Sequence, residues 1–154
     1  MKESDFQKAL TQGLRSQGCF VYKIPDLARA IVKPFDLCVG YQNCLLAIEA
    51  KLKKYGRQKP LQDGDVAIHP ASFQGRGHQL PRLLQIYESD QGYPFIAICV
   101  ARIEMGSAVE TRAWMLPVYC MKVKETWTIG ELDKEECQLT WVPTVGWIAP
   151  WLTK

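Results

Sequence analysis

The chain has 154 residues, of which 47% are hydrophobic and 23% charged, and it carries a formal net charge of +3 at pH 7. These values are typical of a single globular domain with its own core, and they exclude a disordered or fibrous chain. No apolar run reaches the roughly 18 residues that a membrane helix needs, and the polar start Met1–Asp5 does not resemble a signal peptide. We therefore expect a cytoplasmic protein with no membrane partner.

The six cysteines are scattered along the chain, without a CxxC pair or the Cys/His spacing of a zinc site. Most of them lie in apolar runs, so we interpret them as small buried hydrophobic residues in a reducing compartment. The chemistry of the protein is therefore to be sought in other residue types.

Residues 3–17 predict an amphipathic helix. Phe6, Leu10 and Leu14 recur at the three-to-four-residue spacing of one buried helix face. Glu3 stands at the start of this helix, where an acid commonly compensates the helix dipole. The functional alternative is that the Glu3 carboxylate belongs to a metal site formed further along the chain.

Residues 19–24 predict a strand, which Pro25 and Asp26 end. Lys23 interrupts this strand, either as an exposed charge on a sheet edge or as a contact to an anionic substrate. Both interpretations remain open. The basic connection 26–33 that follows has no clear secondary structure.

Residues 34–40 and 45–51 predict two strands of a hairpin, with a turn at residues 40–43. Asp36 lies on the first strand, and Glu49 and Lys51 lie on the second. Because side chains alternate along a strand, Glu49 and Lys51 point to the same face. Such residues are often solvated ion partners, but here they stand among aliphatic residues, where an unpaired charge is costly. Two carboxylates and a lysine on one face therefore indicate a divalent-metal hydrolase.

The run from residue 51 to 59 is strongly basic and leaves directly from the proposed catalytic strand. A basic run is usually solvated surface, but its position here favours contacts to a phosphate backbone. Residues 56–77 are rich in Gly and Pro and show no periodicity, which predicts a mobile flap over bound substrate. The basic residues that we assign to DNA binding in this run are Lys53, Lys54, Arg57 and Lys59.

Residues 78–89 predict a second helix and residues 93–101 a buried strand. Gln79, near the helix start, is either an ordinary polar residue of the first turn or a group that orients a phosphate or a water.

All five tryptophans lie after residue 113. In this tail, residues 112–116 and 125–129 predict further strands, and residues 139–152 predict an aromatic segment without long elements. Packing explains most aromatic tails, with a dimer interface or a base-stacking surface as alternatives. The order of elements predicts an α/β fold, a mixed β-sheet flanked by helices.

Asp36, followed after a turn by Glu49-Ala50-Lys51, resembles the core of the PD-(D/E)XK nuclease superfamily, the restriction-endonuclease-like fold. With Glu3 opening the first helix and Gln79 the next, the set resembles the RecU-like and archaeal Holliday junction resolvases and related phage endonucleases. The resemblance covers residues 3–101 and suggests a nuclease core at 1–104, with a Trp-rich extension at 105–154 packed on the same domain. It departs from the motif in one place, since Phe35 separates Pro34 from Asp36.

The resemblance implies a role for each matched residue. Asp36, Glu49 and the Ala50 carbonyl would bind Mg²⁺, for which Mn²⁺ is expected to substitute. Lys51 would position the attacking water and stabilise the phosphorane. Glu3 would complete the acidic cluster, and Gln79 would lie in the outer ring of the site. Lys23 is a candidate phosphate contact.

The resemblance also implies a function, a Mg²⁺-dependent DNA endonuclease that resolves four-way junctions as a homodimer inside a bacterial, phage-infected or archaeal cell. Three alternatives remain open. The first is another phage or mobile-element nuclease of this fold that acts on duplex or flap DNA. The second is a catalytically silent DNA-binding module. The third is an unrelated α/β protein whose acid–x–lysine strand is a coincidence.

Overall fold

The computed structural model describes residues 1–25, 33–73 and 79–152, and its central sheet mixes parallel and antiparallel strands. The order of this five-stranded sheet is β1-β2-β3-β5-β6. Its strands are β1 (Phe20–Lys23), β2 (Leu37–Tyr41), β3 (Cys44–Gly56), β5 (Tyr93–Glu104) and β6 (Ser107–Pro117). Among the described strands of this sheet, β3 and β5 pair in parallel and the other neighbours pair antiparallel. A parallel pair needs a long crossover, and this one contains α2 (Gln79–Glu88).

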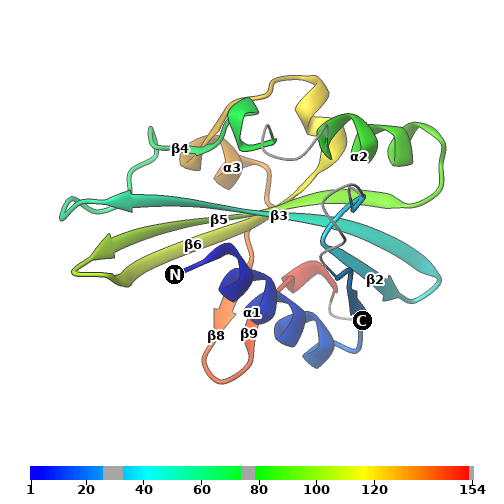
Figure 1. The fold of residues 1–154 in the computed structure, drawn as a ribbon, viewed down its shortest axis with the longest axis horizontal. Helices are drawn as coiled ribbons and strands as arrows, with labels where there is room; N and C mark the ends of the chain where they lie inside the picture. The colour runs from blue at the N-terminus through cyan, green and yellow to red at the C-terminus, as the bar shows by residue number, and fades with distance from the viewer. Residues whose placement is uncertain (26–32, 74–78, 153–154) are drawn as a thin grey trace.

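Both faces of the sheet are covered, which confirms the predicted α/β class with flanking helices (Figure 1). On one face lie α1 (Glu3–Ser16) and the hairpin of β8 (Thr140–Val142) and β9 (Gly146–Ile148). On the other lie α2, α3 (Ile129–Lys134) and β4 (Val66–Ile68), which pairs with β7 (Trp127–Thr128). Short 3₁₀ turns occur at Pro70–Phe73, Val118–Lys122 and Pro150–Leu152.

Side-chain alternation along the strands divides the core into two layers. Leu46, Ile48 and Ala50 of β3 pack with the apolar face of α1, whereas Ile96 and Ile98 of β5 belong to the layer under α2 and α3. The predicted helices and strands before residue 102 are therefore present, with boundaries that differ by a few residues. None of the described helices is long and apolar enough to cross a membrane.

Two details of the predicted hairpin are wrong. Asp36 is not on the first strand but lies immediately before β2, where its N–H donates to the carbonyl of Ile48. The second strand does not end near Lys51 but continues to Gly56. The reason is tertiary, since β3 pairs with β5 from Leu46 to Gly56 and this ladder keeps the basic residues extended.

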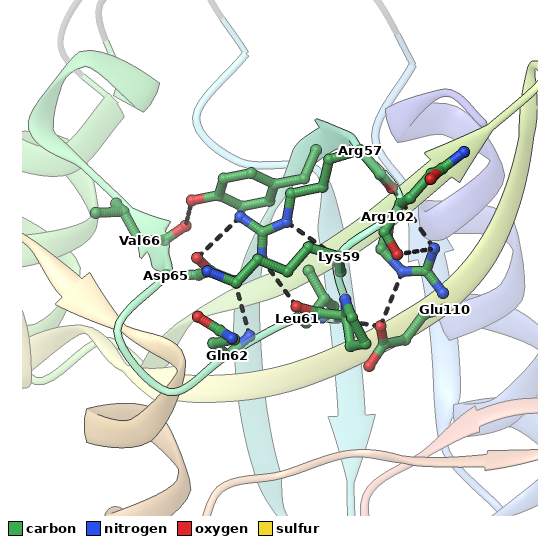
Figure 2. Close-up of polar contacts among 11 residues, drawn as sticks. Arg57, Lys59, Leu61, Gln62, Asp65, Val66, Arg102 and Glu110 are labelled. Carbon is green, nitrogen blue, oxygen red and sulfur yellow. Dashed lines mark hydrogen bonds and ion pairs between the residues drawn. The ribbon is translucent and has the colours of Figure 1, made fainter.

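The predicted mobile flap at residues 56–77 is also wrong for the part that the structure describes, since β4 and a 3₁₀ turn form within it. Figure 2 shows two arginines whose side chains hold the first half of this segment in place. The Arg57 guanidinium forms an ion pair with Asp65 and donates to the carbonyls of Lys59 and Pro60. Arg102 of β5 donates to the Gln58 carbonyl. Residues 74–78 of the predicted flap, including His78 at the predicted helix start, lie outside the described residues.

The tail has two features that the sequence analysis missed. The first is α3, which begins with a capping box of Thr128 and Glu131. The side chain of each residue accepts a hydrogen bond from the backbone N–H of the other. The second is the first part of β6, since the strand predicted at residues 112–116 begins at Ser107 and lies in the central sheet. The division at residue 104 stays a prediction.

The end of the tail is built against α1. The Gln17 side chain donates to the Ala149 carbonyl at 2.7 Å and accepts from the Ala149 N–H at 2.8 Å. Backbone contact is closest at Gly13, where a Cβ atom would lie 1.7 Å from the Trp147 carbonyl oxygen. The hairpin of β8 and β9 therefore fixes the helix whose first residue is Glu3.

We expect Gly13→Ala to lower the free energy of unfolding by about 3 kcal/mol, because the added methyl group forces α1 and β9 apart. Urea unfolding followed by tryptophan fluorescence measures this loss. Gly64→Ala is the matched control, since a Cβ atom there meets nothing within 4 Å. Equal stability of the two variants would contradict close packing of the hairpin on α1.

Candidate active site

The candidate site forms at the point where β2 ends and β3 continues past it. The last β2–β3 pair joins Leu37 to Ile48, so the edge of β3 beyond Ile48 faces side chains instead of a strand. The Ala50 N–H donates to Asp36 Oδ2 at 2.8 Å, and the Leu52 N–H donates to the Glu3 carboxylate. Two acids from distant parts of the chain therefore occupy the open edge of β3.

These acids line a cleft of about 370 Å³. The cleft brings together Glu3, Lys23, Asp36, Glu49, Lys51 and Gln79, which the sequence analysis had proposed for the site. It also contains four residues that the sequence analysis did not single out: Ser4, Gln7, Lys33 and Ser72. Gln7 follows Glu3 at the four-residue spacing of one helix face, and Lys33 precedes Asp36 by three residues. These are local signals for Gln7 and Lys33, whereas Ser4 is simply the next residue after Glu3.

Glu49 is the most unusual group of the cleft. Its residue is 1% exposed, and its Oε2 has no hydrogen-bond partner within residues 1–25, 33–73 and 79–152. Burial raises the pKa of Glu49 well above its usual value, and the negative charge of Asp36 raises it further, while Lys51 acts in the opposite direction. The pKa of Glu3 is raised as well, first by burial. A cation is therefore favoured beside these carboxylates.

Lys51 is held by its neighbours on β3 and α2. Its Nζ donates to Gln79 Oε1 at 2.7 Å and lies 4.0 Å from Glu49 Oε1. It also lies 5.3 Å from the centre of the Phe73 ring. Gln79 therefore orients the ammonium group at the wall of the cleft, beside the buried carboxylate.

Asp36 is 3% exposed and both of its oxygens are engaged. Oδ2 accepts from the Ala50 N–H, and Oδ1 lies 2.9 Å from the Nζ of Lys33. Because the N–H and C=O of a strand residue point to the same side, the Ala50 carbonyl also faces the open edge.

The donor set fits a small hard cation. No group of three or more His, Cys, Asp and Glu side chains in the described part of the chain lies close enough together to form a complete metal cluster. Mg²⁺ does not need one, because it commonly binds one or two carboxylates and keeps several waters. Asp36 and Glu49 satisfy that requirement together with the Ala50 carbonyl, since Glu49 Oε2 has no hydrogen-bond partner among the described residues.

The predicted DNA-binding residues lie in different parts of the structure, and they do not all have free side chains at the cleft. Lys23 lies in the cleft, and Lys53, Lys54 and Lys59 are exposed beyond it, with the Lys54 Nζ 3.3 Å from the Met1 carbonyl oxygen. The Arg57 guanidinium holds the chain between β3 and β4 and stacks on the Tyr55 ring at 4.7 Å. Arg57 therefore has a structural role, and its contact to DNA stays a prediction.

Comparison with protein-family models found no match, and comparison with curated proteins found none. Among solved structures, the chain is similar to Hjc of Archaeoglobus fulgidus, described as a Holliday junction resolvase from an archaeal hyperthermophile. The identity is 15% and the TM-score 0.47, with 85% of this chain and 92% of that chain covered. A similarity of this size supports no conclusion about activity.

We expect Glu49→Gln to stabilise the metal-free protein increasingly as the pH rises from 4.5 to 8. Since the folded pKa of Glu49 is raised, the folded state holds a proton that the unfolded state releases above pH 4.5, so the wild type loses stability with rising pH. Glutamine removes this loss, and we expect a gain of about 2 kcal/mol at pH 8 and none at pH 4.5. Urea unfolding in EDTA at several pH values measures it.

Glu110→Gln is the control, for which we expect stability to fall at higher pH instead of rising. The Leu61 N–H and the Arg102 guanidinium lower the pKa of Glu110. Its carboxylate therefore stabilises the fold above the unfolded pKa, and this variant is expected to lose stability there. Parallel pH profiles of Glu49→Gln and the wild type would disprove the environment assigned to Glu49.

Proposed function

We propose that the protein is a divalent-metal-dependent DNA endonuclease. The observation that carries this proposal is the buried Glu49 carboxylate beside Asp36, with an unpartnered oxygen in the described part of the chain and with Lys51 in the same cleft. An enclosed carboxylate pair of this kind is stable as an anion only next to a cation. Lysines exposed beyond the cleft add affinity for an anionic polymer.

Asp36, Glu49 and the Ala50 carbonyl would hold Mg²⁺ or Mn²⁺, which when bound polarises a phosphodiester and acidifies a coordinated water. Lys51 would donate to a non-bridging phosphate oxygen and stabilise the charge that develops on it. Gln79 would keep the Lys51 ammonium aimed at that oxygen through their 2.7 Å hydrogen bond. Glu3 would orient a water at the edge of the acidic group.

Lys23, on the cleft wall, would contact a phosphate next to the scissile one, and Lys53, Lys54 and Lys59 would follow the backbone away from the site. Arg57 would help by holding the chain between β3 and β4. Such contacts give binding that is independent of sequence and sensitive to salt.

The substrate that we propose is a four-way DNA junction. Resolution of a junction requires two symmetric cuts, and a homodimer with one cleft per subunit supplies them. This choice extends the resemblance of Asp36, Glu49 and Lys51 to the resolvase families. A nuclease of the same fold that acts on duplex or flap DNA is the alternative within this class, and a silent DNA-binding module is the alternative outside it.

We expect purified protein with Mg²⁺ to introduce paired symmetric nicks in a four-way junction and not in flap, duplex or single-stranded DNA. Denaturing gels of end-labelled substrates measure this. Cleavage of all four substrates would indicate a general nuclease. Tight binding without cleavage in Mg²⁺ and in Mn²⁺ would indicate the silent module.

We expect Asp36→Asn, Glu49→Gln and Lys51→Ala each to reduce single-turnover cleavage by about 10²-fold or more while leaving DNA affinity within about threefold. Glu88→Gln, on the exposed end of α2, is the matched charge control and is expected to cleave normally. Full activity of Lys51→Ala would show that the cleft is not the catalytic site.

The double variant Lys53→Ala/Lys54→Ala is expected to weaken binding of all DNA substrates alike. The slope of log K against log salt should fall by about one for each phosphate contact removed. Fluorescence anisotropy titrations at salt concentrations between roughly 50 and 200 mM measure this slope. An unchanged slope would place the DNA elsewhere on the surface.

A further inference from the structure

The two oxygens of the Asp36 carboxylate have partners of different kinds. Oδ2 accepts the backbone N–H of Ala50 at 2.8 Å, a contact that belongs to the edge of β3. Oδ1 lies 2.9 Å from the ammonium of Lys33, a side chain that is 17% exposed, while the Asp36 side chain is 4% exposed. At this distance the contact is a charge-assisted hydrogen bond, and it compensates a carboxylate that is otherwise enclosed.

Oδ1 is the better candidate for a metal ligand, because Oδ2 is engaged by the backbone N–H of Ala50. The partner of Oδ1, Lys33, lines the cleft together with Glu49 and Lys51. An ammonium and a divalent cation on the same carboxylate oxygen repel each other strongly in a partly enclosed site. The two cations are therefore alternatives.

We infer that Lys33 is the resident counter-ion of Asp36 in the metal-free protein and that a divalent metal displaces it. This inference rests on the proposed function, because it takes Asp36 as a metal ligand. Lys33 then performs two opposing tasks. It stabilises the empty site, and it lowers metal affinity by competing for Oδ1. Lys33 is a positioning residue in this scheme, since it acts on the metal through Asp36.

Direct Mn²⁺ binding, measured by electron paramagnetic resonance of free Mn²⁺, tests the competition. We expect Lys33→Met to bind Mn²⁺ about tenfold more tightly than the wild type, the factor for a site that is open about a tenth of the time. Lys33→Arg keeps a cation at the same place and should remain within about twofold of the wild type.

Lys23→Met is the matched control, because Lys23 lines the same cleft, whereas the ammonium that forms the ion pair with Asp36 belongs to Lys33. It removes one positive charge and should tighten Mn²⁺ binding by about twofold or less. An equal gain in Lys23→Met and Lys33→Met would overturn the inference and leave only general electrostatics. Unchanged or weaker binding by Lys33→Met would overturn it as well.

Thermal unfolding supplies a readout that does not depend on affinity. Without metal, Lys33→Met should melt about 5 °C or more below the wild type, because the enclosed Asp36 carboxylate loses its cationic partner at Oδ1. With saturating Mg²⁺ the two should melt together, since Lys33 no longer contacts Asp36. A difference that persists in Mg²⁺ would show that Lys33 is not displaced. If Lys33→Met is unfolded without metal, its folding upon Mn²⁺ addition is the corresponding expected result.

The experiment separates this inference from the proposed function. Mn²⁺ binding by the wild type with no specific effect of Lys33→Met overturns the role of Lys33 and leaves the metal site intact. Absence of Mn²⁺ binding in the wild type and in every variant overturns the metal site, and the role of Lys33 with it.

Discussion

Asp36 and Glu49 place two buried carboxyl groups at the open edge of β3, and the surrounding side chains are arranged to compensate them. β2 ends at Leu37 while β3 continues, so backbone N–H groups of β3 need other acceptors. The carboxylates of Asp36 and Glu3 supply them at Ala50 and Leu52. The same geometry that completes the sheet therefore concentrates negative charge, and Lys33 and Lys51 compensate that charge within the cleft.

The rigidity of this edge comes from elements far from it in the sequence. The parallel ladder with β5 keeps β3 extended from Leu46 to Gly56. The backbone after β3 is held by two guanidinium groups (Figure 2). Arg57 donates to the carbonyls of Lys59 and Pro60, and Arg102 donates to the carbonyl of Gln58. The first half of the long connection to α2 is consequently part of the framework. The 3₁₀ turn after β4 then carries Ser72 at the cleft wall.

The C-terminal tail affects the site through its packing on α1. Its hairpin of β8 and β9 packs on the helix so closely that only glycine fits at residue 13, and Gln17 is bonded to Ala149. Since Glu3 is the first residue of α1, the tail determines where that carboxylate stands relative to β3. These contacts support packing as the role of Trp147, which is 4% exposed. Trp141 and Trp151 of the same segment are 50% and 43% exposed, and their role stays a prediction.

Periodicity and turn residues are local signals, and they correctly predict the fold class, α1, α2 and the strand that carries Glu49 and Lys51. They place Asp36 on the first strand of the hairpin, whereas that strand begins at Leu37. The length of β3 and the order of the connection after Gly56 were decided by the tertiary structure. Pairing with β5 and two arginine clusters override the local preference of a basic, glycine-rich run. The contact of Lys33 with Asp36 and that of Gln79 with Lys51 were likewise decided there, since side chains meet only when the strands and helices that carry them are packed.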